Sequence, residues 1–266
     1  MVEFASGRRP SCSYRPGSDR RRAPLTPPSA PGDPLKLLLT SAGITNDSIR
    51  AALVDLLGKP IAEARALYVP TAIYATPGGV GYSWRGGQEM AELGWAEFGL
   101  LELTALPSMP QDCWLPDLES ADAVIVGGGN GGYLSYWLQQ SGLAAALPKL
   151  LDRLVYLGVS AGSAMVTRQL RVDPDVLANT GVYYDDEYDE AAPAGAGSDR
   201  TLGLVDFVLR PHLFAEYFPA ANRELMLTAA ARVDVPLYAI DDQSAIKVVD
   251  GSVEVVSEGT WELFNG

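Results

Sequence analysis

The sequence has little of what metal binding, disulfide frameworks or membrane insertion requires. Its 266 residues include one histidine and two cysteines, Cys12 and Cys113, which are too few for a cysteine-rich metal site or a set of disulfides. We therefore predict no metal and no other cofactor, and a reducing compartment such as the cytoplasm. No apolar stretch is long enough to cross a bilayer, so we expect no membrane partner.

Positive charge is also scarce. Lys and Arg number 20 against 33 Asp and Glu, which gives a formal net charge of −13 at pH 7. Nucleic-acid binding depends on clustered Lys and Arg, so we predict no nucleic-acid partner. Residues 1–34 combine arginines with Pro, Ser and Gly, and we interpret them as a disordered basic tail. Residues 35–266 are expected to form one domain.

From residue 35 onward, apolar strand patterns alternate with helical patterns. Strands are expected at residues 35–41, 66–70, 100–103, 122–126 and 154–159, and helices at 47–57, 88–98 and 133–140. Continuous apolar strands interleaved with helices are typical of a mostly parallel sheet. The predicted fold class is therefore α/β, in three layers with helices on both faces, and ligands are expected at the carboxyl ends of the strands.

The second half of the chain has a different character. Residues 182–199 are acidic and predict an exposed loop. Asp250 and Gly251 separate two alternating apolar runs and predict a C-terminal β-hairpin. Three further strands and a helix are expected at residues 202–209, 236–240, 260–264 and 223–233.

The most informative segment is Gly158-Val159-Ser160-Ala161-Gly162, which joins a strand pattern to a helix pattern. Gly-x-Ser-x-Gly at such a junction is typical of a nucleophile elbow, where the serine lies on a strained turn and small neighbours leave its hydroxyl accessible. The motif alone is weakly specific, because roughly one chain of this size in ten would contain it by chance. Its position between a strand and a helix strengthens the prediction that Ser160 is a nucleophile.

A serine nucleophile needs a base, and histidine is the usual one. A solitary histidine at a strand end is more often structural, but His212 is the sole imidazole available to Ser160 and is assigned as the base by elimination. Asp241 and Asp242 follow a predicted buried strand, and either could orient His212. For each of them, a turn or helix-cap role is an equally good interpretation.

A second glycine-rich turn, Gly127 to Gly132, follows another predicted strand. The oxyanion of an acyl-transfer reaction requires two backbone donors, which we assign to Ala161 and to either Gly128 or Gly129. A nucleotide-binding turn is the alternative, but the segment lacks the Lys-Ser/Thr of a P-loop. The order Ser, His, Asp also differs from the Ser, Asp, His order of α/β-hydrolases, which indicates another fold.

Four motifs, taken together and in order, resemble peptidase E, the aspartyl dipeptidases of peptidase family S51; cyanophycinase is a more distant relative. They are Val126-Gly127-Gly128-Gly129-Asn130, Gly158-Val159-Ser160-Ala161-Gly162-Ser163, Gly203-Leu204-Val205-Asp206-Phe207 with Pro211-His212, and Ala239-Ile240-Asp241-Asp242. The resemblance covers residues 35–266, which would then be the S51 catalytic domain.

The resemblance implies a class I glutamine amidotransferase-like fold, with serine where the amidotransferases carry cysteine. It implies that Ser160 is the nucleophile and His212 the base. The third catalytic member of the family is a carboxylate, often Glu, and its position here is matched by Asp242. It further implies metal-free removal of an N-terminal aspartate from short peptides. Gly128, Gly129 and Asn130 would then contact the oxyanion and the substrate.

An aspartyl substrate carries a side-chain carboxylate, which an arginine binds well. Arg223, at a predicted helix start, and Arg168, beyond the elbow, are the candidates. The expected partner is thus a small Asp-Xaa peptide, and a homodimer is left open. Two alternatives stay open as well: hydrolysis of another small amide or isopeptide bond, as in cyanophycinase, and a non-catalytic protein that binds a ligand in the same crevice.

Overall fold

The computed structural model describes residues 35–76, 78–170, 200–219 and 221–266. The predicted tail, residues 1–34, and the predicted acidic loop, residues 182–199, lie outside the described residues. Within the described part, no helix combines the length and the apolar character that crossing a membrane requires.

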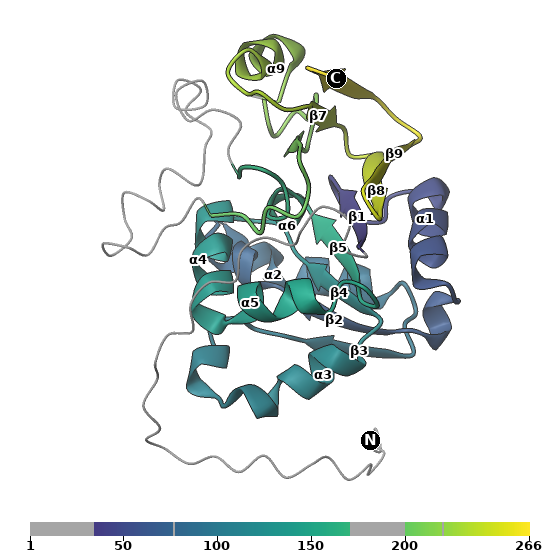
Figure 1. The fold of residues 1–266 in the computed structure, drawn as a ribbon, viewed down its shortest axis with the longest axis vertical. Coiled ribbons are helices and arrows are strands. Elements are labelled where there is room, and N and C mark those ends of the chain that lie inside the picture. Colours follow the sequence, from purple (N-terminus) through teal and green to yellow (C-terminus); the bar gives the residue numbers. More distant parts are fainter. Residues whose placement is uncertain (1–34, 77, 171–199, 220) are drawn as a thin grey trace.

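A seven-stranded sheet forms the centre of the fold (Figure 1). Its strands, in spatial order, are β3 (Glu97–Leu100), β2 (Arg65–Val69), β4 (Ala123–Val126), β5 (Val155–Val159), β1 (Lys36–Thr40), β8 (Ser244–Val249) and β9 (Ser252–Ser257). The first five are parallel, whereas β8 and β9 form an antiparallel hairpin beside β1. The prediction of a mostly parallel sheet with a C-terminal hairpin is confirmed.

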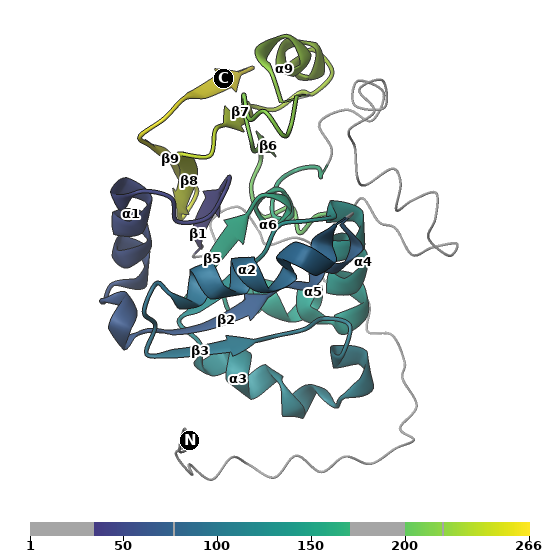
Figure 2. The same cartoon turned by 180° about the vertical axis from the view of Figure 1, so that it is seen from behind.

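Helices cover both faces of this sheet because its strands are apolar on both sides. Along β1, Leu37 and Leu39 face one core cluster and Leu38 faces the other. The first cluster includes side chains from α3 (Leu115–Ser120), α4 (Gly131–Ser141) and α5 (Leu143–Ala146), and the second includes side chains from α1 (Asp47–Leu57) and α2 (Gly79–Ala91). Accordingly, α5 lies in front of the sheet in Figure 1 and α2 lies in front of it in Figure 2.

Local capping chemistry defines where several helices begin and end. The side-chain oxygens of Asn46, Asn130 and Asn222 accept backbone hydrogen bonds at the starts of α1, α4 and α9 (Arg223–Ala230). Gly58 and Gly142, with φ of 68° and 82°, end α1 and α4 in the left-handed conformation that glycine adopts without strain. Among the described residues, the other short helices are α6 (Ala161–Ala164) and the 3₁₀ segments η1 (Ile61–Glu63), η2 (Thr71–Ala75), η3 (Leu106–Ser108), η4 (Gln111–Cys113) and η5 (Leu147–Lys149).

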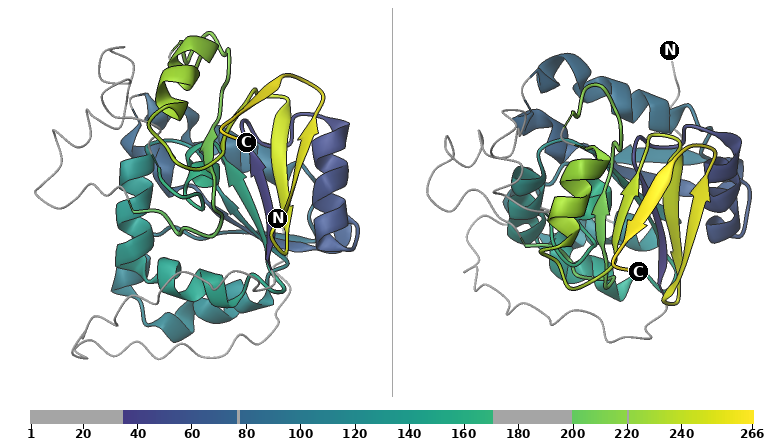
Figure 3. Two further views of the ribbon diagram at one scale, coloured as in Figure 1. Left: turned by 45° about the horizontal axis from the view of Figure 1, so that its top comes forward. Right: turned by 90° about the horizontal axis from the view of Figure 1, so that it is seen from above.

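The sequence patterns did not indicate a second, smaller sheet. Its strands are β6 (Val208–Arg210), β7 (Leu237–Ile240) and β10 (Trp261–Phe264), with β7 in the middle. Together with α9 they enclose a third apolar cluster. In both views of Figure 3 the yellow C-terminal strands lie between the green α9 and the purple α1. The strand predicted at residues 202–209 corresponds to β6, which is shorter and begins at residue 208.

The predicted helix at residues 88–98 is wrong in its limits. The helix α2 spans Gly79–Ala91, and the chain turns at Gly94, whose φ is 87°, before entering β3 three residues earlier than predicted. The glycines of α2 hid the helix pattern, yet packing requires at least one of them. A Cβ on Gly79 would lie 2.0 Å from the backbone carbonyl oxygen of Ile73.

The fully buried Tyr156 of β5 supports the predicted elbow through one hydrogen bond. Its hydroxyl donates a 2.6 Å hydrogen bond to the carbonyl of Gly162. Tyr156→Phe leaves that buried carbonyl without this donor, so we expect the free energy of unfolding in urea to fall by about 1–3 kcal/mol. Tyr238→Phe is the control, because within the described residues the Tyr238 hydroxyl has no hydrogen-bond partner and its ring packs against Phe207. Equal losses in both variants would contradict this reading.

Candidate active site

The predicted elbow is present at the end of β5. Ser160 has φ 52° and ψ −114°, a strained conformation for a residue with a side chain, and α6 begins at the next residue. The flanking glycines allow the close approach of strand and helix. A Cβ on Gly162 would lie 2.0 Å from the carbonyl oxygen of Val126, and one on Gly158 would lie 2.6 Å from the Cα of Ser163.

Thr40, the last residue of β1, holds the elbow in place. Its carbonyl accepts hydrogen bonds from the backbone N–H of Ser160 (3.0 Å) and from the hydroxyl of Ser163 (2.7 Å). Its own hydroxyl donates to the carbonyl of Gly158 at 2.7 Å. The strained turn is thus anchored on both sides by the neighbouring parallel strand.

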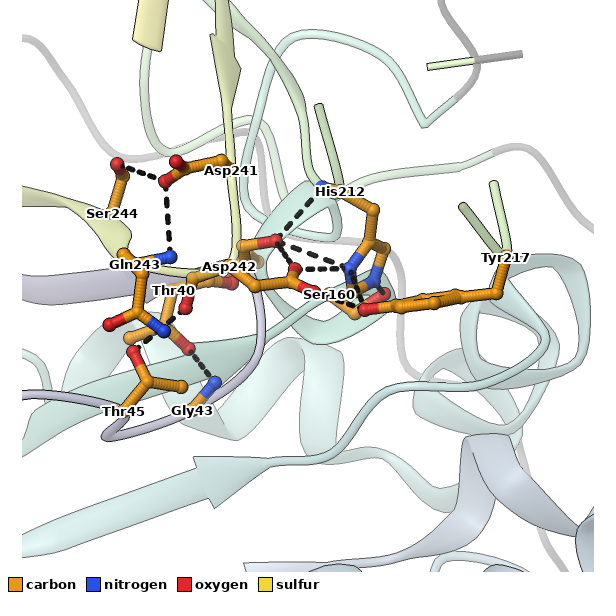
Figure 4. A network of polar contacts seen from close by, with 12 residues as sticks. Thr40, Gly43, Thr45, Ser160, His212, Tyr217, Asp241, Asp242, Gln243 and Ser244 are labelled. Carbon is orange, nitrogen blue, oxygen red and sulfur yellow. Dashed lines mark hydrogen bonds and ion pairs between the residues drawn. The ribbon is translucent and has the colours of Figure 1, made fainter. Parts of the chain in front are cut away.

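The structure brings Ser160, His212 and Asp242 together (Figure 4). The Nε2 of His212 lies 2.8 Å from the Oγ of Ser160, and its Nδ1 lies 2.7 Å from Oδ1 of Asp242. A carboxylate only accepts hydrogen bonds, so Nδ1 carries the proton when it binds Asp242. Nε2 is then left with a lone pair that can accept the Ser160 proton.

The geometry distinguishes the two neighbouring aspartates. Asp242 points toward His212, whereas Asp241 points toward Gln243 and Ser244 (Figure 4). Oδ1 of Asp241 accepts hydrogen bonds from the Gln243 N–H (3.0 Å) and the Ser244 hydroxyl (2.6 Å). Asp241 therefore has the turn-forming role, and Asp242 is the residue placed to orient His212.

Three donors surround the carboxylate of Asp242. Besides His212, the hydroxyl of Ser41 donates to Oδ1 at 2.7 Å and the hydroxyl of Tyr217 donates to Oδ2. Burial alone would raise the pKa of Asp242, but hydrogen bonds from His212, Tyr217 and Ser41 outweigh it and lower the pKa to about 2. Burial, followed by the bond to Asp242, raises the pKa of Tyr217. Asp242 is consequently a carboxylate at neutral pH.

Ser41, a fully buried residue directly after β1, also belongs to the site, although no sequence motif marks it. Its Oγ accepts the backbone N–H of His212 at 2.8 Å and lies 3.2 Å from Nδ1 of the same residue. It thereby fixes the backbone of His212, whose φ is 63°, as well as the carboxylate of Asp242. The available signal was its position, because polar residues at the carboxyl end of a parallel strand often face a site.

Two aromatic residues, also missed from sequence, enclose the imidazole. The ring of Phe218 stacks on that of His212 with centroids 4.7 Å apart and an interplanar angle of 11°. The ring of Tyr217 approaches the imidazole edge-on, with centroids 5.5 Å apart. His212 is 8% exposed, so its ring is held in a single orientation toward Ser160.

Of the residues predicted to contact the oxyanion and the substrate, Gly128 and Ala161 lie next to Ser160, whereas Gly129 and Asn130 shape the turn that leads into α4. Gly128 adjoins the nucleophile, since a Cβ there would lie 2.9 Å from Cβ of Ser160, and Ala161 presents one of the free N–H groups at the start of α6. Gly129 has φ 136°, which only glycine adopts readily. The side-chain oxygen of Asn130 accepts the Tyr133 N–H at 2.8 Å and caps α4.

The two arginines predicted to bind a substrate carboxylate have acidic partners elsewhere. The Nε of Arg223 pairs with Glu262 of β10 at 2.9 Å, and its side chain is 63% exposed. Arg168 pairs with Asp206 and is 51% exposed. No contact among the described residues places either arginine beside Ser160, and the assignment of Arg223 to substrate binding stays a prediction. Across the described ranges, no three His, Cys, Asp or Glu side chains are grouped so as to hold a metal ion.

Comparison with known proteins shows the family of this chain. The family model described as peptidase family S51 matches residues 37–256. A protein named peptidase E from Streptomyces coelicolor is 37% identical over 156 residues, which are 56% of this chain and 58% of that relative. The chain thus matches less than two thirds of that relative's length.

Two solved structures share the fold. One is a Listeria monocytogenes EGD-e protein assigned to peptidase E, with a TM-score of 0.61, 19% identity, and coverage of 85% of this chain and 100% of that one. The other is a peptidase from an acI-B1 Actinobacterium, with a TM-score of 0.57, 16% identity, and coverage of 88% and 93% respectively. At these identities the likeness extends to the fold alone.

The lowered pKa of Asp242 predicts how stability depends on pH. Because the folded pKa, about 2, lies below the ordinary 3.8, ionised Asp242 stabilises the fold above about pH 4, and this contribution is lost as the pH falls toward 2. Asp242→Asn lacks it at every pH. The difference in urea-unfolding free energy between the wild type and this variant should therefore shrink between about pH 4 and pH 2. A difference that stays constant across that range would contradict the assignment.

Proposed function

Because the chain belongs to peptidase family S51, we propose that it is a serine peptidase that removes an N-terminal aspartate from dipeptides of the form Asp-Xaa. The observation that carries this proposal is the contact chain from Ser160 through His212 to Asp242, at 2.8 and 2.7 Å. That geometry is the one required for activating a serine hydroxyl. The substrate class rests on the four motifs and on the similarity to peptidase E.

In the proposed first step, Oγ of Ser160 attacks the carbonyl carbon of the aspartyl residue. Nε2 of His212 takes the hydroxyl proton, and Asp242 stabilises the imidazolium that results. The tetrahedral oxyanion receives hydrogen bonds from the N–H groups of Ala161 and Gly128. His212 then gives its proton to the leaving amine, and an aspartyl ester remains on Ser160.

In the second step, His212 takes a proton from water, which attacks the ester and releases free aspartate. The proton returns from His212 to Oγ of Ser160, so the protein ends in its starting state. Tyr217 and Ser41 keep Asp242 ionised throughout by donating hydrogen bonds to it. The proposal includes a small peptide as partner and no nucleic acid or membrane; a cytoplasmic location stays a prediction from composition.

The first prediction from this mechanism concerns the nucleophile. Ser160→Ala removes the attacking oxygen and should lower kcat for Asp-Leu by about 10⁴-fold or more. The far-UV circular dichroism and melting temperature of the variant are measured alongside, and we expect both to match those of the wild type. Turnover of Asp-Leu at the wild-type rate by Ser160→Ala would refute the mechanism.

The same assay separates the alternative substrates. A panel of Asp-Leu, Asn-Leu, Leu-Leu and β-aspartyl-leucine is given to the wild-type protein, with release of leucine as the readout. Preference for Asp-Leu supports the proposal, whereas preference for the β-aspartyl compound would favour an isopeptide hydrolase. A folded wild-type protein that cleaves none of them and resists labelling by an active-site phosphonate would favour a non-catalytic binding protein.

The second prediction concerns Ser41 as a positioning residue. Ser41→Ala removes one donor to Asp242 and the acceptor of the His212 N–H, so kcat should fall about 10-fold with little change in KM. Loss of that donor also raises the pKa of Asp242, which shifts the acid limb of the stability curve to higher pH. Ser135→Ala, which removes another fully buried serine hydroxyl, is the matched control and should keep the wild-type rate. Equal rates and unshifted acid limbs in both variants would remove Ser41 from the mechanism.

A further inference from the structure

Arg210, the last residue of β6, is a buried cation with two side-chain nitrogens that have no hydrogen-bond partner among the described residues. The residue is 8% exposed, and its Nε and Nη2 are buried without a hydrogen-bond partner among the residues that the structure describes. No ion pair within the described ranges involves its guanidinium. Within the same ranges, its Cζ lies 5.7 Å from the centroid of the Phe218 ring.

This arrangement is costly unless something completes it. A guanidinium stays protonated at any physiological pH, so burial cannot be relieved by loss of the proton. A buried charge without a counter-ion and without acceptors destabilises the folded state, and contact with an aromatic face replaces only part of the lost hydration. An anion with acceptor atoms, supplied from outside the described residues, would provide both the counter-charge and the missing acceptors.

The two unused nitrogens also indicate the shape of that anion. Nε–H and Nη2–H lie on the same edge of the planar guanidinium and point in parallel directions. Such an edge binds both oxygens of one carboxylate in a bidentate fork. The unpaired edge of Arg210 thus matches the two oxygens of a single carboxylate.

Its position ties this site to the catalytic histidine. Arg210 is followed by Pro211 and His212, and the ring of Phe218 contacts both the guanidinium and the imidazole. The charged group is therefore one aromatic ring away from the base that serves Ser160. The arginines predicted from sequence, Arg168 and Arg223, already have carboxylate partners.

We propose that Arg210 is the specificity-determining residue that binds the side-chain carboxylate of the N-terminal aspartate. This inference rests on the proposed function, because it names the group that selects the substrate of that reaction. An overall acidic protein repels an acidic peptide, so selection requires a local cation that no internal carboxylate neutralises. Arg210 meets that requirement, and the substrate is its missing counter-ion.

The test compares Asp-Leu with Asn-Leu, which differ in the charge of one side chain. Arg210→Met keeps the length of the side chain and removes both charge and fork, so the ratio of kcat/KM for Asp-Leu over Asn-Leu should fall about 100-fold. Arg210→Lys keeps the charge without the fork and should lose an intermediate part of the ratio. Arg65→Met is the control, because Arg65 lies at the start of β2 and pairs with Glu97, and it should leave the ratio at the wild-type value.

A binding measurement gives a readout independent of turnover. In the Ser160→Ala background, free L-aspartate should raise the melting temperature, and in Ser160→Ala/Arg210→Met it should not. Without ligand, Arg210→Met should melt no lower than the wild type, because it removes an unpaired buried charge. A purely structural arginine would instead lower the melting temperature of the ligand-free protein.

The outcomes separate this inference from the proposed function. If the wild type cleaves Asp-Leu and both Arg210 variants keep the substrate ratio within about threefold, Arg210 is excluded and the peptidase stands. Should Arg210→Met fail to fold while Arg210→Lys keeps the full ratio, the residue is structural and the inference is overturned. If the wild type cleaves no peptide but aspartate stabilises Ser160→Ala through Arg210, the carboxylate site stands and the proposed reaction fails.

Discussion

The candidate site depends on the corner at residues 241–243, where the chain leaves the small sheet after Ile240 and enters the large sheet at Ser244. Asp241 fixes this corner through its side-chain bonds, and its backbone N–H donates to the carbonyl of Thr260. The loop after β1 fixes it from the other side, since the hydroxyl of Thr45 donates to the carbonyl of Asp242 at 2.7 Å. The carboxylate of Asp242 is thereby held relative to the strand that also anchors the elbow.

Adjacent residues in this corner have opposite roles because their surroundings differ. Asp241 uses its oxygens to hold backbone and serine groups of the same turn, whereas Asp242 accepts bonds from Ser41, His212 and Tyr217, which come from distant segments. Hydrogen bonds to the ionised form lower the pKa of Asp242 and keep a negative charge beside the imidazole. The same side-chain chemistry thus supports the architecture at one position and the electrostatics of the site at the next.

The sequence predicts those parts of the site that depend on local patterns. The elbow is a short motif between a strand and a helix, and His212 is the single imidazole, so both could be identified without a structure. Ser41 could not, because its bonds to His212 and Asp242 span 171 and 201 residues. The choice between Asp241 and Asp242 depends on the direction of each side chain, which composition does not encode. The limits of α2 were missed because glycines are poor helix formers and obscure the helical pattern, although Gly79 is needed where the helix start approaches the carbonyl of Ile73.

The failure to identify Arg210 from sequence has a physical cause that bears on function. An arginine at the end of a short strand is ordinarily at the surface, and its burial here comes from tertiary packing near Phe218. Two charged residues near His212 therefore differ in their partners. Asp242 accepts hydrogen bonds from three donors within the protein, whereas two nitrogens of Arg210 have no partner among the described residues. An internal carboxylate paired with Arg210 would stabilise the free protein and remove the proposed selectivity. Because the described residues supply no such partner, an acidic substrate would complete the electrostatics near His212, and this couples binding of the substrate to the geometry around the base.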